Sequence, residues 1–188
     1  MKIGKHIYEL AEDASTDETK FVSLSRNHTN LLMWSHYAAS HSGFCIAFRR
    51  NHKYFDKAES VRYRRLRFNF NGARDDALKA APAGKSIALE KAVDWAYEEE
   101  EWLFLDDVPI DTTNAGKDAW GRQIILNKFP LDSVAAVYLG LRASPSLVEK
   151  VAGVVLQTSP RIKLYMARKS STQYGLVFKR LKIEVVEV

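Results

Sequence analysis

The sequence predicts an α+β fold, in which a mixed, mostly antiparallel sheet of about eight strands is accompanied by about three helices. Short apolar segments recur along the chain with turn residues between them, which is typical of strands. Few segments carry a helical start signal. Connections between successive segments are short, so most neighbouring strands are expected to run antiparallel, and no regular alternation of strand and helix appears.

The bulk properties indicate one globular domain. The chain has 188 residues, of which 46% are hydrophobic and 27% charged. These proportions are ordinary for a folded domain with its own core. Residues 1–20 are polar and contain an acidic run, so we expect a leader that frays. Residues 21–188 are expected to form a single α+β domain.

Charge and cysteine content indicate the surroundings of the protein. No apolar run approaches the length needed to span a bilayer, and the N-terminus lacks the apolar segment of a secretory signal. Cys45 is the only cysteine, which fits a reducing cytoplasm. The net charge of +5 permits an anionic partner such as nucleic acid, without requiring one.

The first part of the chain reads as strand, helix and strand. Residues 21–25 alternate apolar and small polar side chains, as in a half-buried strand. A helix follows through residue 38, and three polar residues could cap it: Asn27, Thr29 and Asn30. Residues 44–48 are apolar throughout, which predicts a central strand covered on both faces.

The rest of the chain alternates strand signals with two helix signals. Residues 61–70 are β-prone and basic, and residues 85–97 carry a partial apolar stripe that predicts a helix. Residues 111–120 read as a loop. Ser144 and Pro145 predict a helix start, with the helix running to about residue 156. Further strands are expected at residues 102–105, 122–129, 134–139, 162–166, 174–178 and 183–188.

One block of sequence resembles a known family. Residues 33–38 read MWSHYA, and residues 41–48 follow the pattern HxGxCIxF. Together they resemble the bacterial family known as domain of unknown function 2971. Weaker blocks follow in the same order, so the resemblance covers roughly residues 21–180. The sequence lacks the N-terminal segment with an Asn-Asp-Pro element that members usually carry, and Leu103 stands where an arginine usually follows the Glu-Trp element.

The order of elements also resembles ADP-ribosyltransferase folds. In those folds a glutamate at the head of a late strand orients the nicotinamide ribose of NAD, and Glu101 would occupy that place. The resemblance implies NAD as cofactor. Tyr37 and His41 are our candidates for the nucleotide pocket, and Trp34 is either a core residue, as most buried aromatic residues are, or a surface on which a nucleoside stacks. The other three glutamates of the acidic run, residues 98–100, are expected to form a solvated helix end. The alternative for Glu101 is a purely structural role, and Glu99 competes for the catalytic one, because the boundary between helix and strand is set only to within a few residues.

Two histidines are candidates for proton transfer or ligand binding. His36 and His41 flank the expected loop between helix and strand, and a histidine can act as acid or base near neutral pH. His36 is our candidate catalytic residue beside Glu101, although it could equally tie the helix to a backbone carbonyl. Zinc binding with Cys45 is disfavoured, because the spacing is wrong and no fourth ligand is evident. We therefore predict no metal site.

A basic segment could contact phosphates. It interleaves arginines with aromatic residues, which suits phosphate pairing and base stacking. The arginines are Arg62, Arg64, Arg65 and Arg67, with Arg49, Arg50 and Lys53 expected nearby. Strand alternation would place Arg62 and Arg64 on one face. The alternative is a charged edge strand that resists association between sheets.

Three functional hypotheses remain open at the level of sequence. The first is an NAD-using, ADP-ribosyltransferase-like enzyme or a remnant of one. The second is a non-catalytic module that binds nucleic acid or a nucleotide through the arginines. The third is a protein-interaction subunit. For the enzyme hypothesis and for the other two alike, the resemblance implies a bacterial defence or toxin system as the setting. Phosphate-binding loops, nucleophile elbows and zinc-protease motifs are absent from the sequence.

Overall fold

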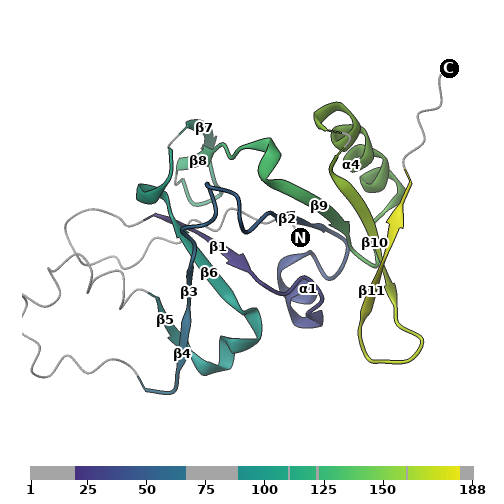
Figure 1. The fold of residues 1–188 in the computed structure, drawn as a ribbon, viewed down its shortest axis with the longest axis horizontal. Helices are drawn as coiled ribbons and strands as arrows, with labels where there is room; N and C mark the ends of the chain where they lie inside the picture. The colour runs from purple at the N-terminus through teal and green to yellow at the C-terminus, as the bar shows by residue number, and fades with distance from the viewer. Residues whose placement is uncertain (1–19, 67–88, 110, 122, 160, 183–188) are drawn as a thin grey trace, which may run out of the picture.

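The computed structural model describes residues 20–66, 89–109, 111–121, 123–159 and 161–182. The expected leader over residues 1–20 therefore lies almost wholly outside the described residues, as does the expected strand over 183–188. The described residues confirm the α+β class (Figure 1). Their strands pair in a mixed, mostly antiparallel way, and they are distributed over four separate sheets.

A three-stranded sheet forms one half of the fold. Strand β6 (Glu100–Phe104) lies in its centre, between β1 (Phe21–Ser25) and β3 (Glu59–Ser60), and both pairings are antiparallel. Side chains alternate across β6. Trp102 and Phe104 pack on one face, while Leu103 packs on the other.

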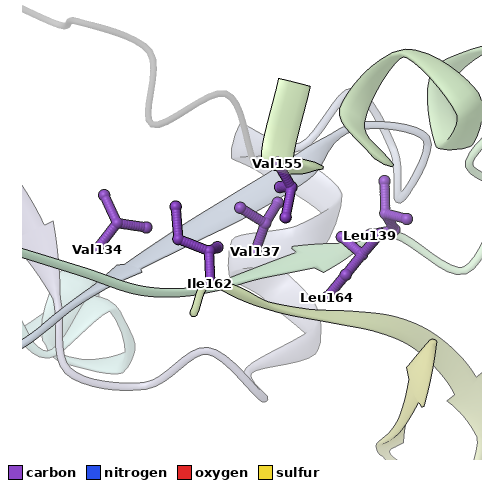
Figure 2. Close-up of a cluster of buried hydrophobic side chains, with 6 residues drawn as sticks. All are labelled: Val134, Val137, Leu139, Val155, Ile162 and Leu164. Atoms are coloured by element: carbon purple, nitrogen blue, oxygen red, sulfur yellow. The ribbon is translucent and has the colours of Figure 1, made fainter. Parts of the chain in front are cut away.

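A four-stranded sheet forms the other half. Its order is β11 (Leu176–Leu181), β10 (Lys163–Lys169), β9 (Val134–Leu139) and β2 (Phe44–Phe48). Helix α4 (Pro145–Thr158) covers one face (Figure 1). Figure 2 shows the buried cluster at that contact, which contains Val134, Val137, Leu139, Val155, Ile162 and Leu164.

Helix α1 (Leu31–Tyr37) packs on the opposite face of this sheet through Trp34, which clusters with Cys45 of β2. Of the three candidate caps of α1, Asn30 is the one that the structure selects, and the predicted Ser144 cap of α4 is confirmed. The side chain of Asn30 accepts hydrogen bonds from the amides of Leu32 and Met33 at the start of α1. The hydroxyl of Ser144 accepts one from the amide of Leu147 at the start of α4.

Aromatic side chains join the two sheets. Phe48 of β2 stacks on Phe55 with ring centroids 4.3 Å apart, and it meets Phe129 edge-on at 5.0 Å. Phe48 and Phe129 pack against the buried clusters of both sheets. These contacts fix the separation of the sheets on one side and position the residues between them.

Three predictions about elements were wrong. Strand β2 is at an edge of its sheet within the described residues, although side chains pack on both its faces. The described part of the predicted helix 85–97 is instead strand β5 (Glu90–Ala92) followed by a 3-10 helix (Val93–Glu98), because β5 pairs with β4 (Arg62–Arg64).

The third error concerns the predicted loop 111–120. It contains β7 (Thr112–Lys117), which pairs antiparallel with β8 (Gln123–Asn127). Gly116 and Gly121 both have positive φ, and these two glycines permit the irregular pairing and the turn between the strands. All six residues of β7 are exposed, so the pattern of buried and exposed residues that identifies most strands is missing here.

Candidate functional site

A cavity of about 380 Å³ opens between the two sheets, where the ends of β1 and β2 come close to the start of β6. This volume lies in the range of small-molecule sites, roughly 300–1,000 Å³. Its walls come from four segments of the chain. They are residues 24–28 at the end of β1 and just after it, two residues of α1, a group in and after β2, and one residue of β6. The α1 residues are Met33 and Trp34, the group in and after β2 is Cys45, Ile46, Ala47, Phe48, Arg50, Phe55 and Ala58, and the β6 residue is Glu101.

Glu101 is the acidic residue of this cavity. It is the second residue of β6 and is only 6% exposed, because β1 and β3 pair with β6 on both sides of it. Its register partners are Leu24 and Ser60. The carboxylate therefore has a fixed position near the start of a central strand, whereas the sequence indicated only that Glu101 stands at the head of a strand.

Two arginines neutralise this carboxylate. The Nη1 group of Arg50 donates a hydrogen bond to Oε1 of Glu101, and Nη1 of Arg26 lies 3.9 Å from the same oxygen. The bond and the charge of Glu101 raise the pKa of Arg50. Because the cavity holds one carboxylate and two guanidinium groups, its local charge favours an anionic ligand.

The apolar wall is provided by Trp34, which is only 2% exposed. Its indole nitrogen donates to the carbonyl oxygen of His28 at 2.7 Å, which fixes the ring. Burial lowers the pKa of His28, whose ring lies 4.4 Å from that of Tyr138. Trp34 thus lines the predicted pocket, but as a packed wall more than as a free stacking surface.

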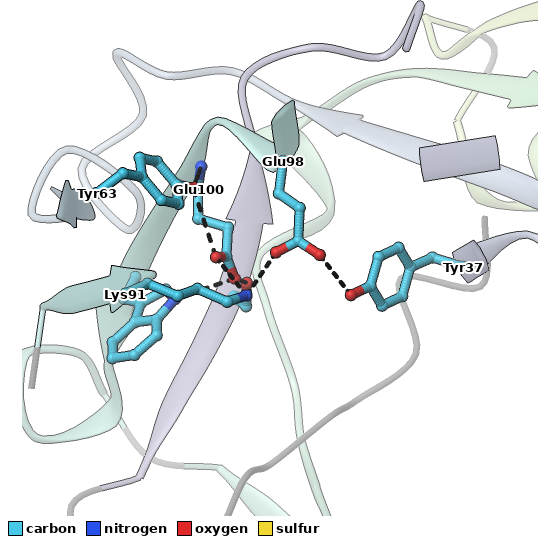
Figure 3. A network of polar contacts seen from close by, with 7 residues as sticks. Tyr37, Tyr63, Lys91, Glu98 and Glu100 are labelled. Atoms are coloured by element: carbon cyan, nitrogen blue, oxygen red, sulfur yellow. Dashed lines mark hydrogen bonds and ion pairs between the residues drawn. The ribbon is translucent and has the colours of Figure 1, made fainter. Parts of the chain in front are cut away.

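A buried polar network lies beside the cavity, on the opposite face of β6 (Figure 3). Lys91 Nζ donates to Glu98 at 2.5 Å and to Glu100 at 2.8 Å. Tyr37 donates to the other oxygen of Glu98 at 2.5 Å. The backbone amide of Glu100 donates to the hydroxyl of Tyr63 at 2.8 Å. This network ties α1, β4, β5 and β6 together.

The acidic run is therefore not a solvated helix end, and that interpretation was wrong. Glu98, Glu100 and Glu101 are all buried. Glu99 adopts a left-handed conformation with φ of 47° between the 3-10 helix and β6, and the residues on either side of it, Glu98 and Glu100, both contact Lys91. Glu101 then points to the other face of the strand, and Glu99 accepts a hydrogen bond from Asn27.

The two histidines and Tyr37 lie away from the cavity wall. His36 is exposed, with its ring 6.4 Å from Tyr97. Tyr37 is held by Glu98. His41 lies in a turn with φ of 70°, and its Nδ1 is buried without a hydrogen-bond partner among the described residues. Burial lowers the pKa of His41, and Arg142 adds to the effect.

The basic segment is only partly described, and Arg67 lies outside the described residues. Arg62 and Arg64 lie on one face of β4, as predicted, and both contact Glu90, at 3.7 and 3.1 Å. Arg65 is exposed after the strand. These ion pairs reduce the charge that Arg62 and Arg64 present to a phosphate backbone.

Sequence reasoning missed Arg26 and assigned Arg50 to a different neighbourhood. Arg26 follows directly after β1 and Arg50 comes two residues after β2, and both strands were predicted. The antiparallel pairing of β1 with β6 brings the end of β1 to the start of β6. That pairing was the signal that could have placed Arg26 beside Glu101.

No group of three or more His, Cys, Asp or Glu residues in the described part of the chain is arranged to hold a metal ion.

The fold and this site define an α+β protein with a charged cavity between two sheets. Residues 33–102 match the model of the family described as "Protein of unknown function (DUF2971)". The match begins in the MWSHYA block and ends at Trp102, so it confirms the resemblance to that family over these residues, and the weaker blocks after Trp102 lie outside it. No curated protein and no solved structure matches the chain. No helix in the described ranges has the length and apolar character needed to cross a membrane.

Proposed function

We propose that the cavity between the sheets binds NAD, and that Glu101 orients the nicotinamide ribose for transfer of the ADP-ribosyl group. One observation carries this proposal: a buried carboxylate at the head of a central strand lines a cavity together with two arginines. A carboxylate can accept hydrogen bonds from ribose hydroxyls. The arginines suit the negatively charged diphosphate of the same ligand.

The chemistry assigned to Glu101 is electrostatic. In the proposed reaction the glycosidic bond between the ribose carbon and nicotinamide breaks, and nicotinamide leaves with the bonding electrons. Positive charge develops on the ribose, and a nearby carboxylate stabilises it. A lone pair of the acceptor then forms the new bond to the ribose carbon, and the acceptor loses a proton to solvent. Water as acceptor gives hydrolysis.

His36 and Tyr37 have a smaller part in this proposal than the sequence suggested. Neither residue lines the cavity. Tyr37 contributes by holding Glu98, which lies three residues before Glu101. Trp34, by contrast, keeps its proposed place as part of the pocket wall, and His28 joins it there.

The transferase proposal is tested by nicotinamide release. Purified protein is incubated with NAD, and free nicotinamide is quantified by chromatography, with Glu101→Gln as the test variant and Glu149→Gln as the control. Glu149 is an exposed residue of α4. We expect release by the wild type and the control, reduced by about 100-fold in Glu101→Gln, the size of effect seen when one stabilising group is removed from a transition state. Equal release by all three proteins would contradict the role of Glu101.

A further inference from the structure

We propose that Arg50 blocks Glu101 through its hydrogen bond until a phosphorylated ligand displaces the arginine, so that the cavity selects phosphorylated ribosides over unphosphorylated ones. We call this displaceable contact between Arg50 and Glu101 the latch. This inference rests on the proposed function, because it requires the ribose to bind Glu101. It adds a residue that determines specificity, and it states that Arg50 is displaced before the ribose binds Glu101. Without ligand, Arg50 is hydrogen-bonded to Oε1 of Glu101, one of the two oxygens of the carboxylate that the ribose must reach.

The two partners of the ion pair differ strongly in their surroundings. The Arg50 side chain is 64% exposed, whereas that of Glu101 is 8% exposed. Arg50 comes from the turn that follows β2, and Glu101 is held within the sheet by pairing on both sides. The arginine can therefore turn toward solvent or toward a ligand while the carboxylate stays in place.

Charge balance supports the exchange. In the ligand-free cavity the carboxylate of Glu101 faces Arg50 and, at 3.9 Å, Arg26. When a phosphate group binds Arg50 through paired hydrogen bonds, Glu101 still has Arg26 as its counter-charge. The freed oxygen can then accept a hydrogen bond from a ribose hydroxyl. The carboxylate of Glu101 and the phosphate of the ligand therefore each have an arginine as counter-charge.

The latch predicts opposite effects on two ligands when Arg50 is removed. An unphosphorylated riboside must compete with Arg50 for Glu101, so removal of Arg50 should strengthen its binding. A phosphorylated riboside gains a charged contact from Arg50, so removal of Arg50 should weaken its binding. Arg26→Met is the matched control, because it removes the same charge from the cavity and leaves the hydrogen bond between Arg50 and Glu101 intact.

The experiment is a calorimetric titration of the full chain with nicotinamide riboside, nicotinamide mononucleotide and NAD. The proteins are the wild type, Arg50→Met and Arg26→Met. In Arg50→Met we expect NAD and the mononucleotide to bind about tenfold more weakly, because one charge-assisted hydrogen bond is lost. We expect the riboside to bind the same variant several-fold more tightly. In Arg26→Met the phosphorylated ligands should weaken without any gain for the riboside.

Other outcomes of the titration contradict the latch alone, or the latch together with the proposed function. If the affinity for the riboside rises equally in both variants, the increase reflects the removed charge alone and the latch is wrong. If Arg50→Met weakens the riboside or leaves it unchanged while NAD still binds the wild type, the latch fails and the proposed function stands. If none of the three ligands binds the wild type at millimolar concentration, both the latch and the proposed function fail. Unchanged thermal unfolding of both variants confirms that they fold.

Discussion

Gly140 faces the carbonyl oxygen of His41 so closely that a Cβ atom at position 140 would lie 2.1 Å from that oxygen. The same carbonyl accepts a hydrogen bond from the amide of Arg142 at 2.9 Å, and the amide of Gly140 donates to Gly43 at 2.9 Å. The turn after α1 and the turn after β9 are thereby packed backbone to backbone. His41 thus contributes to the fold through its main chain.

Replacing Gly140 by alanine should destabilise the protein by about 1–3 kcal/mol or more, because backbone atoms must move to admit the methyl group. Gly153 is the matched control. It lies in α4, and a Cβ atom there meets nothing within 4 Å. Gly153→Ala should stabilise by about 0.5–1 kcal/mol through helix propensity. Urea unfolding measures both, and equal midpoints for the two variants would disprove the close packing.

Removing Lys91 should be costly, because Glu98 and Glu100 would remain buried without a counter-charge. We expect Lys91→Met to lower the free energy of unfolding by about 3 kcal/mol at neutral pH, at the low end for a broken buried pair since Lys91 is partly exposed. Lys150→Met, at an exposed position of α4, should change it by less than about 0.5 kcal/mol. A small effect of Lys91→Met would show that the network adds no net stability.

The stability should also fall in acid. Burial alone raises the pKa of Glu100, but hydrogen bonds from Lys91 and Ser23 outweigh burial and hold this pKa below its ordinary value of 4.5. The unfolded state therefore binds the proton more readily, so the contribution of Glu100 is present above pH 4.5 and is lost as the pH falls below it. In Lys91→Met the main bond is gone, so the gap between variant and wild type should narrow on acidification. A gap that stays constant from pH 7 to pH 3 would contradict this.

Cys45 should be unreactive in the folded protein. Burial raises the pKa of its thiol to about 11, so almost no thiolate is present near neutral pH. We expect alkylation by iodoacetamide at pH 7.5 only after unfolding in guanidinium, detected as an added mass on the intact protein. Rapid labelling without denaturant would show that the thiol reaches solvent through the cavity.

Much of the fold could be predicted because local signals agree with tertiary contacts. Alternation identified β1, the polar residue before an apolar stripe identified α1, and a serine followed by proline identified α4. Strand β5 was taken for helix because an apolar stripe over a short segment suits either structure, and its pairing with β4 decides. Strand β7 has no buried residues, so its sequence shows no alternation of apolar and polar side chains by which a strand could be predicted.

The candidate site was predictable only in part. Glu101 could be placed at the head of a strand from the residues around it, whereas its partners come from segments far away in sequence. The surroundings of Glu98 and Glu100 depend on the left-handed conformation of Glu99 and on Lys91, which one-dimensional patterns do not reveal. A run of four acidic residues suggests solvation until the counter-charges are known.

The most direct test of the central claim is a calorimetric titration of NAD into the wild type and Glu101→Gln. Glutamine keeps the size of the side chain and removes the charge, and Glu149→Gln controls for a lost charge elsewhere. We predict saturable binding by the wild type and the Glu149→Gln control, with affinity reduced about tenfold or more in Glu101→Gln. Binding of equal strength by all three proteins, or no binding at millimolar NAD, would contradict the assignment of this cavity as an NAD site.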